Sequence, residues 1–333
     1  MNSQQQKIQE RIALAAQRIV NILRKHGIAT MRMLEQKISD AGPNPQRVDP
    51  HILTKSRIML VDKEVLGVRM LGNTPWYYIR TADPATVGAR FTELSALHGQ
   101  TERRAFTDRM GDTAEIAVMK AMQRTAQQFV GHFTDLDQHG DDLRYMKHDP
   151  DFFSGKPIIG GKLDYILFSP LGAGMGIEIK NTREWIYPDK DIVTQLLRKC
   201  VQIDVIPVLV ARRIHYTTFS VLNACGGVVH QFYNQLYPNA EASLAELVRD
   251  KTALGYFDVR VGNEPDQRFL HFFGHSIPSV AEESREKFDK YKGLIAEYTG
   301  GEISYAELYA RLMGGDNENE GEGPDWDPDE DLL

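Results

Sequence analysis

The stretch Gly160–Asn181, "GGKLDYILFSPLGAGMGIEIKN", places Asp164, Glu178 and Lys180 in a segment that otherwise has the composition of two buried strands. "LDYILFS" is apolar, aromatic and β-branched, "PLGAG" has the composition of a turn, and "MGIEIK" is apolar again. The pattern predicts a hairpin that holds Asp164 on its first strand and Glu178 and Lys180 on its second.

These charges have a chemical use if they lie close together. Side chains alternate across a sheet, so Glu178 and Lys180 are expected on one face, with Asp164 on the neighbouring strand. Two nearby carboxylates repel unless a cation lies between them, and Mg²⁺ takes one or two carboxylates together with waters and a phosphate oxygen. A lysine beside such an ion can activate water and stabilise charge on phosphorus. In the alternative, Asp164 caps a turn and Glu178 pairs with Lys180 on a solvated face.

A further carboxylate lies upstream in "GDTAEIAVMKAM". If this segment is helical, Glu115 shares the apolar stripe of Val118, Met119 and Met122. A carboxylate on a core-facing stripe needs a partner. It therefore either joins the acidic pair, reaches out to solvent or pairs with a nearby base.

This constellation resembles the active site of the PD-(D/E)xK nuclease superfamily. The matching residues are Asp164, preceded by Leu163 where the family often has Pro, and Glu178-Ile179-Lys180, which begins 14 positions after Asp164. Glu115 would match a helix glutamate found in many members, and Gln195 in "DIVTQLLRKCVQ" a glutamine on the following helix. The apolar segment "DVIPVLVARR" would be the central parallel strand. The resemblance covers about residues 101–235.

The resemblance implies an α/β fold: a restriction-endonuclease-like mixed sheet flanked by helices. It implies an endodeoxyribonuclease that uses Mg²⁺ or Mn²⁺ to hydrolyse phosphodiester bonds in DNA, and we also expect a homodimer. The implied metal ligands are Glu115, Asp164 and Glu178, and Lys180 and Gln195 complete the catalytic set. Gln195 could instead belong to the polar face of its helix.

The branches of the superfamily that the chain resembles most are the Holliday-junction-resolvase-like and Mrr-like enzymes. An alternative function is a DNA-binding or assembly protein that uses the nuclease-like domain as a scaffold in a replication, packaging or transposition complex.

The N-terminal part has a different organisation. Helical patterns cover about residues 6–25, "TMRMLEQKISDAG" and "DPHILTKSRIMLVDKE", and two strand-like runs follow in "VLGVRMLGNTPWYYIR". This order resembles a winged helix-turn-helix domain over about residues 6–80, in which the third helix usually enters the major groove. Such domains also bind proteins. The DNA-contact candidates are His51, Thr54, Lys55 and Arg57 on the third helix, with Arg69 and Arg80 on the wing.

We therefore expect a small winged-helix domain at residues 1–82, a linker at 83–100, a nuclease-like domain with C-terminal helices at 101–315 and a disordered acidic tail at 316–333. A long helix is predicted over about 101–130 and two strands within "YFDVRVGNEPDQRFLHFFGHSI". His271 and His275 flank the end of one of these strands, and core or surface roles suit them better than metal binding.

Charge is distributed unevenly along the chain. The net charge is −7, but residues 316–333 contain nine acids and no Lys or Arg, so residues 1–315 carry 39 bases and 37 acids. The body is therefore compatible with a DNA partner. Arg212 and Arg213, followed by His215 and Tyr216, lie at the carboxyl end of the predicted central strand, where they could contact phosphates or form a solvated strand end.

The acidic tail has three possible roles. It could occupy the protein's own basic groove, dock a partner through Trp326, Leu332 and Leu333, or act only as a solubiliser. The chain lacks an apolar run of about 18 residues and the composition of a signal peptide at its start, so we expect a cytoplasmic protein. Cys200 and Cys225 are expected to be buried thiols.

Overall fold

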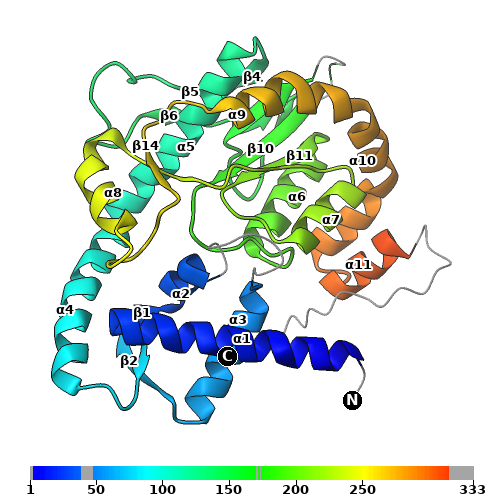
Figure 1. Cartoon of the computed structure of the whole chain (residues 1–333). Coiled ribbons are helices and arrows are strands. Elements are labelled where there is room, and N and C mark those ends of the chain that lie inside the picture. Colours follow the sequence, from blue (N-terminus) through cyan, green and yellow to red (C-terminus); the bar gives the residue numbers. More distant parts are fainter. Residues whose placement is uncertain (1–2, 39–47, 170–171, 173, 315–333) are drawn as a thin grey trace. The chain divides into compact units, whose positions relative to one another are not determined.

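The computed structural model describes residues 3–38, 48–169, 172 and 174–314. The chain divides into two compact units, the first formed by residues up to 107 together with 241–260, and the second by 108–240 together with the residues from 261 onward (Figure 1). Both contain helices and strands, so the protein is a mixed α/β protein. The acidic tail with Trp326, Leu332 and Leu333 lies outside the described residues, as does part of the turn predicted at "PLGAG".

The first unit begins with the predicted order of helices and strands. Three helices precede the hairpin: α1 (Ser3–His26), α2 (Met31–Ile38) and α3 (Pro50–Asp62). The hairpin strands are β2 (Leu66–Leu71) and β3 (Thr74–Ile79). A short strand that the sequence did not predict, β1 (Ile28–Thr30), pairs antiparallel with β3, which gives the sheet order β1-β3-β2.

The linker expected at residues 83–100 is wrong, because these residues form helix α4 (Pro84–Thr101). The carboxylate of Asp83 accepts hydrogen bonds from the backbone N–H groups of Ala85 and Thr86, and Pro84 occupies the first turn. Val87, Phe91, Leu94 and His98 form a buried stripe at helical spacing. The composition "TADP" therefore marks the start of a helix.

The same unit receives a second segment from much later in the chain. Residues 241–260 include helix α8 (Ala242–Arg249). The Lys37 ammonium donates hydrogen bonds to the carbonyls of Lys251 at 2.7 Å and Ala253 at 3.2 Å. The Arg90 guanidinium donates to the carbonyl of Thr252 at 2.6 Å. The expected continuous domain at 101–315 is therefore interrupted by a segment that belongs to the first unit.

The second unit is built on one mixed five-stranded sheet in the order β12-β11-β10-β9-β4. The predicted hairpin and parallel strand are confirmed: β9 is antiparallel to β10 and β4, whereas β10, β11 and β12 run parallel. The strands are β4 (Gln128–Val130), β9 (Tyr165–Phe168), β10 (Gly174–Lys180), β11 (Ile206–Ala211) and β12 (Val228–Gln231). The start of β9 and the ends of β10, β11 and β12 therefore meet at one edge.

Helices complete the second unit. They are α5 (Arg104–Arg124), α6 (Asp191–Ile203), α7 (Tyr216–Ala224), α9 (Gln267–His271), α10 (Ile277–Gly300) and α11 (Tyr305–Met313). One core cluster joins the apolar stripe of α5 to Ile177 and Val208, and another joins α6 to Ile166 and Leu209. Alternate residues of the strands thus contribute to different cores, which is the period expected for a sheet packed on both faces.

Four very short strands lie between β4 and β9. They form two separate hairpins: β5 (His132–Phe133) with β6 (Lys147–His148), and β7 (Phe152–Phe153) with β8 (Lys156–Pro157). Two-residue strands carry too little periodicity to be predicted from sequence.

The two strands predicted within "YFDVRVGNEPDQRFLHFFGHSI" are only partly correct. Strand β14 (Val259–Val261) is present, but the second segment forms α9 and a π-helical turn, η2 (Phe272–Ser276). The Asp266 carboxylate caps α9 by accepting from the backbone N–H groups of Arg268 and Phe269. His271 and His275 consequently stack on each other along the helix, with ring centroids 5.2 Å apart, instead of flanking a strand end.

Both cysteines are buried free thiols, as predicted, and burial raises the pKa of each. Among the helices of the described ranges, none combines the length and apolar composition needed to cross a membrane.

Candidate active site

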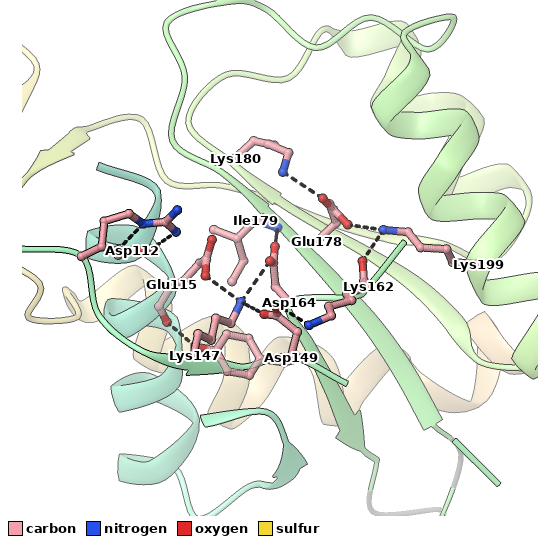
Figure 2. A network of polar contacts seen from close by, with 12 residues as sticks. Asp112, Glu115, Lys147, Asp149, Lys162, Asp164, Glu178, Ile179, Lys180 and Lys199 are labelled. Atoms are coloured by element: carbon pink, nitrogen blue, oxygen red, sulfur yellow. Dashed lines mark hydrogen bonds and ion pairs between the residues drawn. The ribbon is translucent and has the colours of Figure 1, made fainter. Parts of the chain in front are cut away.

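The centre of the site is an ammonium group surrounded by acids. The Nζ of Lys147, on β6, lies 2.6 Å from a carboxylate oxygen of Glu115, 2.8 Å from one of Asp149 and 3.1 Å from one of Asp164 (Figure 2). Only 9% of the Lys147 side chain is exposed, so the lysine is held inside this cluster. Of the possibilities open for Glu115, the structure combines two: it joins the acids and it pairs with a base.

Asp164 is fixed by the backbone of the neighbouring strand. Its Oδ2 accepts a hydrogen bond from the N–H of Ile179 at 2.6 Å, and its own N–H donates to the carbonyl of Ile177 at 3.0 Å. Asp164 lies just before β9, and the hairpin places it beside the carboxyl-terminal half of β10. This arrangement holds its carboxylate next to the acid-x-Lys segment.

Glu178 and Lys180 lie on the same face, as the strand period predicts. The Lys180 ammonium contacts one carboxylate oxygen of Glu178 at 2.8 Å, and the Lys199 ammonium contacts the other at 2.7 Å. Figure 2 shows the two lysines approaching Glu178 from different sides. The predicted alternative of a Glu178–Lys180 pair is therefore real as a contact, but Glu178 is only 12% exposed, so the pair does not lie on a solvated face.

The electrostatics reflect burial and crowding. Burial and the nearby Asp164 carboxylate raise the pKa of Glu115 to about 8, although Lys147 opposes this shift. Burial disfavours the charged form of Lys147, but the carboxylates of Asp164 and Glu115 outweigh it and raise the pKa of the lysine. The pKa of Lys180 is raised in the same way, with Glu178 opposing burial. For Glu115, burial and the Asp164 carboxylate therefore outweigh the attraction of the Lys147 ammonium.

Helix α5 is anchored so that Glu115 faces this cluster. The hydroxyl of Tyr165 donates to the backbone carbonyl of Glu115 at 3.0 Å. One turn earlier, the Asp112 carboxylate accepts from the Arg144 guanidinium at 2.9 and 3.2 Å and from the backbone N–H of Tyr145 at 3.2 Å. These bonds tie α5 to the sheet and to the segment that leads into β6.

Gln195 does not join the site in the way the sequence suggested. It is exposed on α6, and Lys199, one turn later, makes the contact with Glu178. Lys199 also donates to the carbonyl of Lys162 at 2.7 Å. The signal for Lys199 was available, because it shares the helical stripe of the buried residues Leu196 and Cys200. Lys147 left no comparable signal, since it comes from a two-residue strand.

The basic residues at the end of β11 are buried. Arg212 is 2% exposed and Arg213 is 6% exposed, so neither forms the solvated strand end considered as an alternative. An Arg212 amino group donates to the carbonyl of Arg183 at 3.5 Å. The guanidinium of Arg213 lies 5.6 Å from the ring centre of Trp185.

The arginines predicted to contact DNA, Arg57, Arg69 and Arg80, make contacts with other side chains of the first unit. Arg57 donates to the hydroxyl of Tyr77 at 2.5 Å, and Arg69 lies over the ring of Phe91 at 3.8 Å. Such contacts are favoured by the negative face of an aromatic ring. On the wing, Arg80 pairs with Glu64 at 3.0 Å. The other candidates on α3, His51, Thr54 and Lys55, are partly exposed.

A metal ion can be tested against these residues. Within the described part of the chain, no group of three or more His, Cys, Asp or Glu side chains is arranged to hold a metal ion. However, Glu115, Asp149 and Asp164 all contact a single cation, the Lys147 ammonium. Carboxylate oxygens are the donors that Mg²⁺ and Mn²⁺ prefer. The donor types therefore suit a divalent ion, but the Lys147 ammonium occupies the position between these carboxylates.

Comparison with known proteins gave no match: no family model, curated protein or solved structure matches the chain.

The raised pKa of Glu115 predicts a pH-dependent stability. A carboxyl group that binds its proton more tightly in the folded state stabilises the fold below its unfolded pKa, near 4.5, and this stabilisation is lost as the pH rises towards about 8. Glu115→Gln removes the charge while keeping the shape. At pH 9 we expect this variant to be more stable than the wild type by about 1 kcal/mol or more, the equivalent of one pKa unit.

The measurement is chemical unfolding in EDTA at pH 4 and pH 9. The difference between wild type and Glu115→Gln should shrink towards pH 4. Glu286→Gln, at an exposed position on α10, serves as the control and should show no such trend. A variant that is less stable than the wild type at pH 9 would show that the Glu115 carboxylate is a net stabilising partner of Lys147.

Proposed function

We propose that the second unit is a metal-dependent nuclease of the PD-(D/E)xK type that hydrolyses phosphodiester bonds in DNA. One observation carries the proposal: Asp164, Glu178 and Lys180 lie together at one sheet edge, with Glu115 directed at the same place from α5. Acids and lysines so close together and so little exposed carry a large desolvation cost. A catalytic role accounts for that cost.

The residues suggest a division of roles. Asp164, Glu178 and Glu115 would hold Mg²⁺ or Mn²⁺, which, when bound, polarises the phosphate and activates water. The Lys180 ammonium, less buried than the other lysines of the site, would contact the scissile phosphate and stabilise the negative charge that develops there. Lys199 would hold the Glu178 carboxylate in position.

The architecture supports the proposal at a coarser level. The second unit has a mixed sheet with helices packed on it, and its central strands carry the site, as in the restriction-endonuclease-like fold. Within the first unit, α1, α2, α3 and the three-stranded antiparallel sheet have the order of elements found in a winged-helix domain. We propose that this domain contacts DNA through α3. A homodimer remains a prediction.

One observation favours a second candidate, a DNA-binding or assembly protein that uses this unit as a scaffold. The Lys147 ammonium takes the position of the cation among the carboxylates, and Lys180 and Lys199 together neutralise Glu178. In a scaffold, these ion pairs would serve only to close the sheet edge.

Substitution of the site separates the two candidates. Asp164→Ala and Glu178→Ala should each lower Mg²⁺- or Mn²⁺-dependent cleavage of supercoiled plasmid by about 100-fold or more, the scale on which loss of one preorganised polar group slows catalysis. Lys180→Ala should lose cleavage but retain metal binding, because the ammonium is not a ligand. Glu286→Ala, on the surface of α10, is the matched control. Full activity of Asp164→Ala would refute the nuclease proposal.

Lys147 offers an independent test. Lys147→Met removes the ammonium and leaves three carboxylates without their shared counter-ion, so the variant should be less stable than the wild type in EDTA. If the carboxylates form a metal site, Mn²⁺ should bind this variant more tightly than the wild type and restore its melting temperature. Titration calorimetry and thermal unfolding measure both effects.

The control for this test is Lys156→Met, at an exposed position on β8. It should leave Mn²⁺ affinity and stability unchanged. If Mn²⁺ binds neither the wild type nor Lys147→Met, the cluster is a structural ion-pair network and the scaffold function is favoured.

A further inference from the structure

A group of aromatic rings lies in the loops that follow the parallel strands of the second unit. His215 stacks on Tyr187 with ring centroids 4.7 Å apart, and its ring also lies 4.8 Å from that of Tyr216 and 6.4 Å from that of Trp185. Tyr216 is 63% exposed. A further ring, that of Tyr233, is 44% exposed. Large aromatic side chains held partly in solvent on a folded surface are typical of binding sites.

The strand register places these rings at the same sheet edge as the candidate active site. Lys180 ends β10 and pairs with Ala211, which ends β11, and Ala211 pairs with Gln231, which ends β12. Trp185 and Tyr187 follow β10, His215 and Tyr216 follow β11, and Tyr233 follows β12. Neighbouring strands lie about 4.8 Å apart, so the loops after the three strands start within roughly 10 Å of one another.

Positive charge accompanies the rings. The guanidinium carbon of Arg213 lies 5.5 Å from the ring centre of Tyr233, and that of Arg268 lies 5.3 Å from it. Arg213 also lies 5.6 Å from the ring centre of Trp185 and is almost completely buried beneath this surface. Arg213 therefore supports the rings of Trp185 and Tyr233 from within, and the partly exposed Arg268 is the cationic group that a polyanion can reach.

The backbone conformation of Tyr233 suggests that this residue has a functional role. Its φ is +67°, in the left-handed region that a bulky L-residue adopts only at an energetic cost. Glycine or asparagine would meet this requirement with less strain. Tyr233 is 44% exposed, with two guanidiniums near its ring, so it is not a core residue. Such strain is characteristic of functional positions.

We propose that Trp185, Tyr187, His215, Tyr216 and Tyr233 form a stacking platform for unpaired nucleotides of the substrate. The inference rests on the proposed nuclease function, because it assigns the substrate class of that site: DNA with a single-stranded segment next to the bond that is cut. In a duplex, neighbouring base pairs cover the faces of each base, so exposed rings cannot stack on them. Unpaired bases offer those faces, and Arg268, whose side chain is 48% exposed, can contact a phosphate between them.

The test is binding without metal, so that cleavage plays no part. Full-length protein in EDTA is titrated with three probes labelled with a fluorophore: an oligothymidine of about 16 nucleotides, the same length of abasic phosphodiester strand, and a blunt duplex of equal length. We expect the oligothymidine to bind most tightly. Tyr233→Ala should weaken its binding roughly tenfold, the scale of one lost stacking contact, with little effect on the abasic strand. Tyr233→Phe should retain binding.

Two further variants make the result specific. Phe257→Ala removes an exposed aromatic ring elsewhere and should leave all three affinities unchanged. Tyr233→Gly relieves the backbone strain, so it should lose oligothymidine affinity with no fall in melting temperature, which separates a binding defect from unfolding. Equal affinity for the oligothymidine and abasic strands, or no effect of Tyr233→Ala, would overturn the platform.

Cleavage and binding measured together distinguish a failure of the nuclease proposal from a failure of the platform. If neither Mg²⁺ nor Mn²⁺ supports cleavage but oligothymidine binding still depends on Tyr233, the platform stands as a single-strand binding surface. If Mg²⁺-dependent cleavage depends on Asp164 while Tyr233→Ala changes nothing, the nuclease stands and the platform is refuted.

Discussion

The ammonium of Lys147, held between the carboxylates of Glu115, Asp149 and Asp164, sets the electrostatic balance of the second unit. Few carboxylates can approach so closely inside a protein without a cation between them, because each raises the proton affinity of the others. The lysine allows α5, the β5–β6 hairpin and the start of β9 to converge on the end of β10. Any divalent ion that binds there has to replace this contact, so folding and metal binding depend on the same few atoms.

Much of the site could be predicted from sequence because its parts are local. Strand alternation placed Glu178 and Lys180 on one face, and the hairpin brought Asp164 alongside them. Lys147 could not be found in this way, since its strand is two residues long and two of its three partners, Asp164 and Glu115, lie 17 and 32 positions away. Lys199 was missed for a different reason: the polar side of α6 drew attention to an exposed glutamine, although the buried stripe of the helix included the lysine.

The errors in domain organisation have physical causes as well. A Thr-Ala-Asp-Pro sequence favours a turn, but it equally provides an N-cap and a proline for the first helical turn, and the buried stripe that begins at Val87 decides in favour of a helix. Residues 241–260 are bound to the rest of the first unit by hydrogen bonds that Lys37 and Arg90 donate to the backbone carbonyls of residues 251–253. Contacts between side chains and backbone so far apart in the chain leave no periodic signal.

The topology of the sheet places the proposed active site beside the proposed stacking platform. Parallel pairing of β10, β11 and β12 brings three loop starts to the edge where Lys180 lies, and all three loops carry aromatic rings. In the proposed nuclease, the acids and lysines would act on any phosphodiester bond, because phosphates are the same in every sequence and every strand form. Selection among nucleic acids therefore has to come from groups beside the site. The left-handed backbone of Tyr233, costly for a bulky residue, fixes one such group beside the proposed site, where the platform would hold an unpaired base.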